Sequence, residues 1–295
     1  MSGEREIPET GLARAGQEVR PSVVLTTYDQ PRALELVLWG YARQTHTDFE
    51  IVVADDGSGP RTGEVIDRLS EETSLDIRRV WHEDRGFRKT EILNRAIVAA
   101  TGQYLIFSDG DCIPREDFVA VHTSEARADT FLSGGYLKLP RGLSESLTAD
   151  DVCSGSVFRR SWLASRGWKG GRRLLRLTRS RRVGTILDRV TPTRATWNGH
   201  NASTWKGSIL AVNGFDMDMG YGGLDRALGE RLANIGVSGR QIRHRAPCLH
   251  VWHPRPYRTP EVTAANRAIR DRIRANREEW ARVGIAELGD SDASV

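Results

Sequence analysis

The chain has 295 residues, of which 39% are hydrophobic and 28% charged, a composition that excludes a disordered, collagen-like or coiled-coil protein. No apolar run approaches the ~20 residues needed to span a bilayer, and the polar N-terminus lacks the apolar stretch of a signal peptide, so we expect a cytoplasmic protein. The formal net charge of +4 comes from 39 arginines and 4 lysines set against 39 acids, and the three scattered cysteines are expected to be free thiols.

Apolar runs alternate with helical patterns between residues 22 and 111. The expected strands are 22–28, 48–58, 76–83 and 103–111, and the expected helices are 31–44, 61–72 and 89–102. This rhythm favours a doubly wound, mostly parallel α/β sheet, in which ligands bind beyond the carboxyl ends of the strands. The polar residues at the strand ends are therefore expected to meet in one crevice. They are Thr26, Thr27, Tyr28, Asp55, Asp56, Asp109 and Asp111.

The pattern beyond residue 114 is less regular. We expect a helix at 115–128, one strand at 131–139, a helix at 224–236, an apolar segment at 245–254 and a terminal amphipathic helix at 260–282.

A basic segment lies between Arg159 and Arg194, where 11 arginines and one lysine accompany a single acid, Asp188. Such a segment favours an anionic neighbour. Leucines alternate with arginines over 170–190 as in an interfacial helix, so one interpretation is peripheral contact with an anionic membrane. A charged acceptor and a solvated loop in an arginine-rich genome are the alternatives.

Asp109-Gly110-Asp111 follows the fourth expected strand. Alternate residues of an extended chain point to the same side about 7 Å apart, so the two carboxylates can flank one divalent cation. Gly110 leaves room for a close ligand, and an open site with oxygen ligands suits Mg²⁺ or Mn²⁺ shared with a diphosphate. The alternative is a polar turn in which Asp111 caps the next segment.

A cationic loop precedes the third expected helix and contains Gly86, Arg88 and Lys89. The N–H groups at the start of a helix, its dipole and the neighbouring cations can receive a diphosphate. Solvated side chains are the alternative for Arg88 and Lys89. The sequence has no Gly-x-Gly-x-x-Gly, phosphate-loop or Gly-x-Ser-x-Gly motif, which argues against hydride transfer, simple NTPase and serine hydrolase chemistry.

Three blocks resemble, in order and spacing, the inverting nucleotide-sugar glycosyltransferases of family 2, which have the GT-A fold. They are VVLTTYDQPRALELVLWGYARQTHTDFEIVVADDGS, RGFRKTEILNRAIVAATGQYLIFSDGDCIP and NGFDMDMGYGGLD. The resemblance covers about residues 22–255, and the second block is similar to bacterial polysaccharide and chondroitin-type synthase domains.

The resemblance implies roles on the donor side of the site. Thr26, Thr27 and Tyr28 would lie beside the nucleotide, and Asp55 or Asp56 would accept a hydrogen bond from a base, implied to be uracil. Asp109, Gly110 and Asp111 would serve the ribose and the metal, and Asn94 would support the donor loop, unless it is simply a surface asparagine. Gly86, Arg88 and Lys89 would lie at the diphosphate.

The resemblance also implies a catalytic base, Asp225, for which a helix N-cap is the alternative role. Tyr221 and Gly223 of the same block would contact the acceptor, while Leu224 stands where the family usually has a second acid, which leaves the acceptor class open. Asn201 and Trp205 would build the floor of the acceptor site, unless Trp205 packs in the core.

A C-terminal histidine would complete the metal site in this resemblance. His253 is slightly favoured over His250, and neutral imidazole is well suited to this role.

The expected protein is thus a metal-dependent inverting glycosyltransferase that uses Mn²⁺ or Mg²⁺ and moves a sugar from a UDP-sugar to a hydroxyl of a glycan, polysaccharide or glycolipid. A catalytically altered GT-A binding domain and a sugar nucleotidyltransferase are the alternatives, and no nucleic-acid partner is expected. The expected divisions are a flexible leader (1–20), a nucleotide-sugar half (21–140), a basic connecting segment (141–196), an acceptor half (197–258) and a C-terminal helix and tail (259–295).

Overall fold

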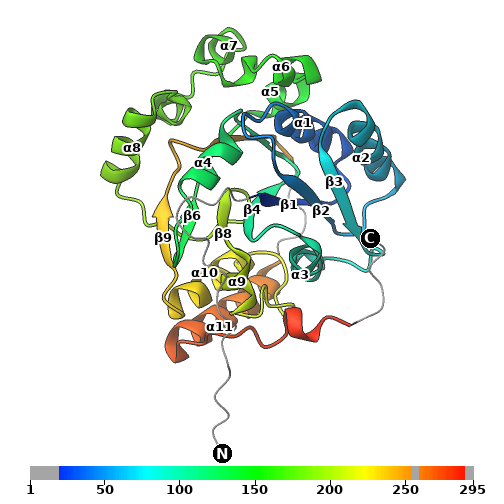
Figure 1. Ribbon diagram of the computed structural model, residues 1–295, viewed down its shortest axis with the longest axis vertical. Helices are drawn as coiled ribbons and strands as arrows, with labels where there is room; N and C mark the ends of the chain where they lie inside the picture. The colour runs from blue at the N-terminus through cyan, green and yellow to red at the C-terminus, as the bar shows by residue number, and fades with distance from the viewer. Residues whose placement is uncertain (1–19, 254–258, 290–295) are drawn as a thin grey trace, which may run out of the picture.

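The structure, a computed structural model, describes residues 20–253 and 259–289 (Figure 1). The leader expected at 1–20 lies outside the described residues except for Arg20, as does the end of the expected tail, 290–295. Within the described parts, no helix is both long and apolar enough to cross a bilayer. The cysteines are free thiols, as expected: Cys112 and Cys248 are buried, whereas Cys153 is exposed.

The N-terminal part forms the expected parallel sheet. Its four strands, in spatial order, are β3 (Asp76–Trp81), β2 (Glu50–Asp55), β1 (Pro21–Thr27) and β4 (Tyr104–Asp109). The helices between them are α1 (Pro31–Ala42), α2 (Pro60–Glu72) and α3 (Lys89–Ala99). In the register of the sheet Thr27 lies opposite Asp55 and Thr26 opposite Asp109, so the polar strand ends share one edge.

Three further strands extend this sheet. The order continues from β4 through β8 (Ala202–Trp205) and β6 (Thr130–Ser133) to β9 (Ser238–Gln241). Strand β8 runs antiparallel to both neighbours, whereas β6 and β9 are parallel to each other. The mostly parallel α/β sheet expected from the sequence is confirmed.

A second, three-stranded sheet has the order β5 (Cys112–Pro114), β10 (Pro247–His250) and β7 (Gly135–Lys138). The single strand expected at 131–139 is therefore wrong, because the chain changes sheet at Gly134. A Cβ at this glycine would lie 1.8 Å from Oδ1 of Asn201, so only glycine fits at the point where the chain changes sheet. Strand β10 is antiparallel to β5 and places His250 opposite Cys112, directly after Asp111.

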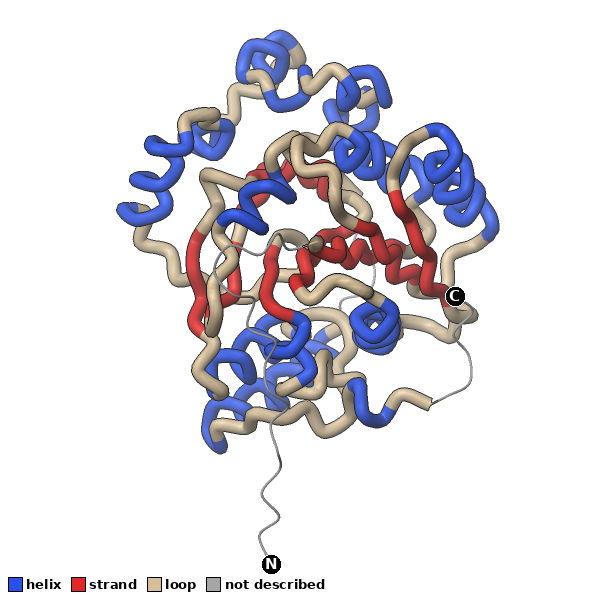
Figure 2. The backbone as a smooth tube through the Cα atoms, in the orientation of Figure 1, coloured by secondary structure: helices blue, strands red, loops and turns tan. Residues whose placement is uncertain are grey.

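The remaining helices surround the two sheets (Figure 2). They are α4 (Phe118–Ser124), α5 (Arg141–Ser146), α6 (Ala149–Cys153), α7 (Arg160–Ser165), α8 (Arg181–Val190), α9 (Lys206–Leu210), α10 (Leu224–Asn234) and α11 (Pro260–Asn276), with 3₁₀ turns at Ser156–Phe158, Gly171–Leu177 and Ile285–Glu287. Helices α5 to α8 follow one outer rim, and α9 to α11 gather on the opposite side (Figure 1). The expected helix at 260–282 ends earlier, at Asn276, because Arg277 adopts a left-handed conformation with φ of 51°.

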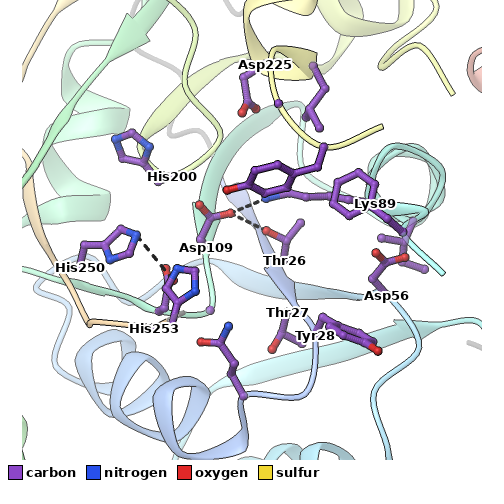
Figure 3. Close-up of a pocket in the computed structure, with 18 of the residues that line it drawn as sticks. Thr26, Thr27, Tyr28, Asp56, Lys89, Asp109, His200, Asp225, His250 and His253 are labelled. Atoms are coloured by element: carbon purple, nitrogen blue, oxygen red, sulfur yellow. Dashed lines mark hydrogen bonds and ion pairs between the residues drawn. The ribbon is translucent and has the colours of Figure 1, made fainter. Parts of the chain in front are cut away.

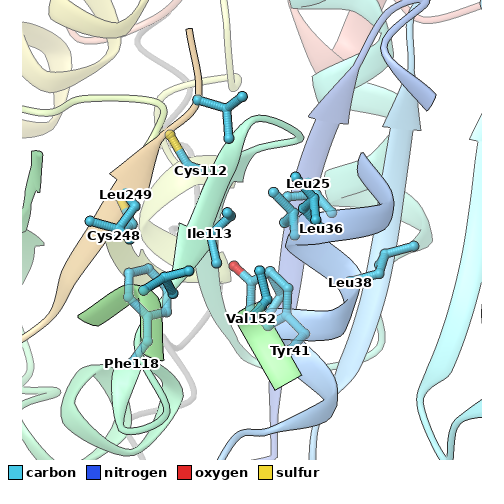
Figure 4. Packing of buried hydrophobic residues seen from close by; sticks show 14 of the residues in the cluster. Leu25, Leu36, Leu38, Tyr41, Cys112, Ile113, Phe118, Val152, Cys248 and Leu249 are labelled. Atoms are coloured by element: carbon cyan, nitrogen blue, oxygen red, sulfur yellow. The ribbon is translucent and has the colours of Figure 1, made fainter. Parts of the chain in front are cut away.

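Hydrophobic clusters cover both faces of the main sheet. Alternate residues of β1 point to opposite faces, so Val23 and Leu25 join one cluster and Val24 joins the other. The first cluster packs β1 against α1 and continues to the second sheet through Ile113 (Figure 4). Burial on both faces is typical of a strand inside a parallel sheet, and it leaves the strand ends as the place for polar side chains.

Candidate active site

A cavity of about 460 Å³ lies at the carboxyl ends of β1 and β4 (Figure 3). The expected site residues that line it come from both halves of the chain. They are Thr26, Thr27, Tyr28, Asp56, Gly86, Lys89, Asp109, Gly110, Asp111, Tyr221, Asp225, His250 and His253. The structure thus brings together most of the residues that the sequence singled out.

Asp225 projects into this cavity from the first turn of α10. The helix begins at Leu224 after Gly223, which occupies the N-cap position, so Asp225 is not the N-cap. Its Oδ1 is buried and receives no hydrogen bond of ordinary geometry from the described residues. Burial and the nearby Asp109 raise the pKa of Asp225 to about 6, although Lys89 opposes the shift. A carboxylate with this pKa is suited to accept a proton near neutral pH.

Lys89 and Asp109 form an ion pair in the centre of the cavity. The Lys89 Nζ and the Thr26 Oγ1 each donate to Asp109 Oδ1 at 2.7 Å. Burial alone would lower the pKa of Lys89, but the carboxylates of Asp109 and Asp225 outweigh it and raise that pKa. The side chain therefore carries a positive charge between two acids, where it can face an anionic ligand.

Asp111, His250 and His253 form a group with the spacing of a metal site. Their ligand atoms all lie within 4.8 Å of one another, and Asp111 Oδ2 is 2.9 Å from His253 Nε2 and 3.6 Å from His250 Nε2. The two imidazole rings are stacked, with centroids 5.3 Å apart. Both histidines that the sequence offered as alternatives thus lie beside the same carboxylate.

The orientation of His250 supports metal binding by this group. Its Nδ1 lies 2.7 Å from the carbonyl oxygen of Val251, which can only accept a hydrogen bond, so Nδ1 carries the proton. In the neutral ring Nε2 then presents its lone pair toward Asp111, and two electron-rich atoms that face each other favour a cation between them. A histidine whose other nitrogen donates to a carbonyl is typical of metal ligands. The donor set therefore fits a divalent cation.

Asp109 and Gly110 differ from the expectation in detail. Asp109 also lies near Asp111, but its carboxylate already contacts Lys89 and Thr26. Gly110 donates to the carbonyl of Thr26 at 2.6 Å, and a Cβ on Gly110 would lie 3.0 Å from that oxygen. The close approach of β1 therefore favours a small residue here, in addition to any ligand.

The opposite wall contains Asp56, Tyr28 and the loop before α3. Asp56 contacts the ring of the buried His82 at 2.9 Å and accepts from the backbone N–H of Arg88 at 3.2 Å. Burial raises the pKa of Asp56, although these contacts oppose the shift. The Tyr28 hydroxyl donates to Asp84, and the Gly86 N–H donates to the same carboxyl group. Carboxylates therefore fix the loop that we expected to receive a diphosphate.

Three of the expected donor-side residues do not line the cavity. Asp55 is fully buried, pairs with Arg79 at 2.6 Å and accepts from the N–H of Ser58. The Arg88 guanidinium contacts Glu91 and the carbonyl of Glu83. The third, Asn94, is fully buried within α3 and bonds both backbone groups of Phe215 at 2.8 Å. It is therefore not a surface asparagine.

The expected acceptor residues do not all line the main cavity either. Asn201 is buried between the sheets, where its amide donates to the carbonyls of Gly135 and Ala246. The Trp205 indole donates to the carbonyl of Arg127 and packs against Tyr104. Gly223 lines a neighbouring groove against α11. Among the four expected acceptor residues, Tyr221 lines the main cavity.

The sequence interpretation missed several residues that line the cavity, including His200, Tyr136, Phe87 and Gln30. Burial lowers the pKa of His200 to about 4, so its ring is neutral at pH 7. Its ring meets that of Tyr136 edge to face, with centroids 4.6 Å apart. His200 belongs to an irregular stretch before β8, where no periodic signal marked it.

Comparison with known proteins relates part of the chain to a described family. Residues 22–136 match the family described as glycosyl transferase family 2. The validoxylamine A glucosyltransferase of Streptomyces hygroscopicus subsp. jinggangensis is 32% identical over 226 residues, which is 73% of this chain and 52% of that protein. The hyaluronan synthase of Pasteurella multocida is 31% identical over 124 residues, or 42% of this chain and 13% of that protein. The chain spans about half the length, or less, of these relatives.

Solved structures share the fold. The mannosyltransferase PcManGT from Pyrobaculum calidifontis, in complex with GDP-Man and Mn²⁺, has a TM-score of 0.56 at 21% identity, covering 82% of this chain and 59% of that one. TarS residues 1–349 from S. aureus, in complex with UDP-GlcNAc, also has a TM-score of 0.56, at 15% identity, covering 87% and 71% of the two chains. The described chain therefore has the GT-A fold.

Proposed function

Because the chain carries a glycosyl transferase family 2 domain, we propose that it transfers a sugar from a nucleoside-diphosphate sugar to an acceptor hydroxyl, with inversion at the anomeric carbon. Asp225 is the general base of this proposal, and Asp111, His250 and His253 hold a divalent cation. The observation that carries the proposal is that one cavity contains both the proposed base and the three proposed metal ligands, with the Lys89–Asp109 pair between them (Figure 3).

The environment of Asp225 supports its assignment as the general base. With a pKa of about 6, its carboxylate is ionised at neutral pH and still basic enough to take the proton of a hydroxyl as that hydroxyl attacks. The buried Oδ1 lies close to the backbone at Gly199, so the carboxylate is placed at the wall of the cavity. Inversion in one step requires a single base on the acceptor side, and Asp225 fills that role without a second carboxylate.

The cation site lies beside the aspartates at the end of β4. A divalent cation bound there would neutralise the diphosphate and stabilise the charge that builds on it as it leaves. Because two of the three ligands are nitrogens, we favour Mn²⁺ over Mg²⁺, which prefers oxygen ligands. Lys89 remains charged beside this position and attracts the same anionic group.

The donor and the acceptor are proposed as classes. Asp56 and Tyr28 line the wall away from the histidines, so we place the nucleotide base there, and uracil follows from the resemblance of the sequence. The solved neighbours were obtained with GDP-Man in one case and UDP-GlcNAc in another, so both bases belong in a test. Hydroxyls of glycans, polysaccharides and glycolipids are the proposed acceptors, and validoxylamine A is added to the acceptors to be tested because one relative is named as its glucosyltransferase.

The test combines donor binding with turnover. UDP- and GDP-sugars are screened by thermal shift with and without Mn²⁺, and the donor that binds is then incubated with the protein while release of nucleoside diphosphate is measured. We expect Asp225→Asn to lower the rate by about 10²–10⁴-fold and to leave the donor-dependent thermal shift in place. Asp218→Asn is the matched control, because Asp218 is exposed and does not line the cavity.

The outcomes separate the alternatives. Donor binding without any release of nucleoside diphosphate would indicate a binding domain, and pyrophosphate release from a nucleoside triphosphate and a sugar phosphate would indicate a nucleotidyltransferase. An Asp225→Asn variant as fast as the wild type would remove the assigned base.

A further inference from the structure

The outer face of α8 carries exposed apolar side chains. Val183, Ile186 and Val190 are 45%, 58% and 65% exposed, and their spacing of three and four residues places them on one side of the helix. Leu175, in the preceding 3₁₀ turn, is 44% exposed. These four are more than half of the seven large hydrophobic side chains that are exposed in the described chain, and all four fall within the segment 175–190.

The helix is attached to the protein by its opposite, polar side. Gly184 and Asp188 are its buried residues. Asp188 accepts from the backbone N–H of His244 and from Nε of Arg245, at 2.9 and 2.8 Å. A Cβ on Gly184 would lie 2.9 Å from the Arg245 side chain, so the helix backbone lies close against this loop. The apolar side is therefore held outward by specific contacts.

Arginines flank the apolar face. Arg182 and Arg189 are exposed on α8, and Arg172 and Arg173 are exposed in the 3₁₀ turn. The one acid of the basic segment, Asp188, points inward to His244 and Arg245, so it does not neutralise them. The outer surface of 171–190 thus combines aliphatic side chains with positive charge.

We propose that the outer face of α8 and the turn 171–177 bind the surface of an anionic lipid bilayer. Exposed aliphatic side chains enter the interface between headgroups and acyl chains, while the flanking arginines contact anionic headgroups. A helix with this arrangement lies flat on the membrane. The position of α8 on the outer rim of the molecule leaves it accessible to a planar surface (Figure 1). Because the exposed arginines give this surface a positive charge, it favours an anionic bilayer over an uncharged partner.

The inference does not depend on the proposed glycosyl transfer, because vesicle binding requires no donor or acceptor. The full chain is mixed with sedimentable vesicles of phosphatidylcholine alone or of phosphatidylcholine with phosphatidylglycerol, at low and high salt. We expect binding to the anionic vesicles at low salt, weaker binding at high salt, and little binding to neutral vesicles. Absence of binding to the anionic vesicles would overturn the proposal.

Paired variants separate the contribution of the apolar face from that of charge. Ile186→Glu with Val190→Glu is expected to reduce the partition coefficient at least tenfold. Val98→Glu with Leu210→Glu adds the same charge at other exposed positions and is expected to bind more strongly than the α8 pair. Arg182→Gln with Arg189→Gln is expected to weaken binding by about fivefold for each arginine.

Two results would contradict the inference. Equal vesicle binding by the two glutamate pairs would mean that the apolar face makes no contact. Sedimentation of the vesicle-free wild type as a dimer, with the Ile186→Glu and Val190→Glu variant monomeric, would identify the face as an interface between two copies of the chain. Circular dichroism confirms that the variants compared are folded.

Discussion

At the scale of single residues, the most consequential group is the carboxylate of Asp225. Its pKa of about 6 results from burial and Asp109, with Lys89 acting in the opposite direction. Since the pKa is raised in the folded protein, ionisation of Asp225 costs folding free energy. Its contribution to stability is full below about pH 4, the unfolded value, and is lost as pH rises through 6.

This pKa predicts the pH profile of the reaction. The rate is expected to rise with pH through an acid limb near 6 and then to level off, because the base must be ionised. Lys89→Met removes the cation that lowers the pKa of Asp225, so the limb is expected to move to higher pH, whereas Lys89→Arg keeps it near the wild-type position. The kcat/KM profile of the three proteins measures this. A limb that stays fixed in Lys89→Met would mean that another group limits the rate.

Gly199 is predicted to position Asp225. A Cβ at this residue would lie 2.5 Å from Asp225 Oδ1, and the end of that side chain can move, so Gly199→Ala is expected to displace the carboxylate without unfolding the protein. A displacement of about 1 Å can cost ~10²-fold in rate. We expect kcat to fall by that order while the donor KM and the melting temperature stay near wild type.

Gly207→Ala is the matched control for Gly199→Ala, because a Cβ there meets nothing within 4 Å. A Gly199→Ala variant with unchanged kcat would show that the carboxylate tolerates the shift.

Metal binding by Asp111, His250 and His253 is also predicted at this scale. Mn²⁺ is expected to raise the melting temperature by mass action, equivalent to about 2.7 kcal/mol at 100 times its Kd. Asp111→Ala and His253→Ala are expected to reduce this shift. His46→Ala is the control, because His46 contacts its own loop at the carbonyl of Asp48. If Mn²⁺ raised the melting temperature of all four proteins equally, the cation would bind elsewhere.

At the scale of elements, Asn94 connects α3 to the loop before α10. Its amide satisfies both the N–H and the carbonyl of Phe215. Asn94→Ala leaves two buried groups unpaired, at about 1–3 kcal/mol each, so a lower free energy of unfolding is expected in urea. Donor KM is expected to stay near wild type.

The control for Asn94→Ala is Asn276→Ala, at the exposed end of α11. Unchanged stability together with a raised donor KM in Asn94→Ala would favour the donor-side role that the resemblance implied.

The elements that the sequence predicted well depend on local patterns. Strands β1 to β4 and helices α1 to α3 show a regular alternation of apolar residues, and parallel strands bring their ends to one edge. Asn94 and Asn201 were harder to interpret, because an amide in a motif looks the same whether it binds a ligand or the backbone of a distant segment. Asn201 joins the two sheets through partners 45 and 66 residues away, which no local pattern reveals.

At the scale of the whole molecule, the cavity draws on both ends of the described sequence. Thr26 and Asp109 come from the parallel half, whereas Asp225 and the two histidines come from the last third of the chain. The resemblance connected these distant segments, because it rests on three sequence blocks that follow one another in a fixed order. His200 and Tyr136 fall between the second and third of those blocks, and only the packing of the two sheets places them at the cavity.

The insertion of β8 between β4 and β6 governs the order in which a newly synthesised chain can fold. Strand β6 leaves the ribosome well before β8, yet in the described structure its partners in the sheet are β8 and β9. Strand β7 likewise pairs with β10, which is synthesised much later. The four parallel strands and their helices can assemble early, while the intervening chain stays unpaired and open to chaperones. A partly made protein would thus hold one wall of the cavity without Asp225, His250 and His253, so the site is completed only when these later segments have been synthesised, not at the first collapse.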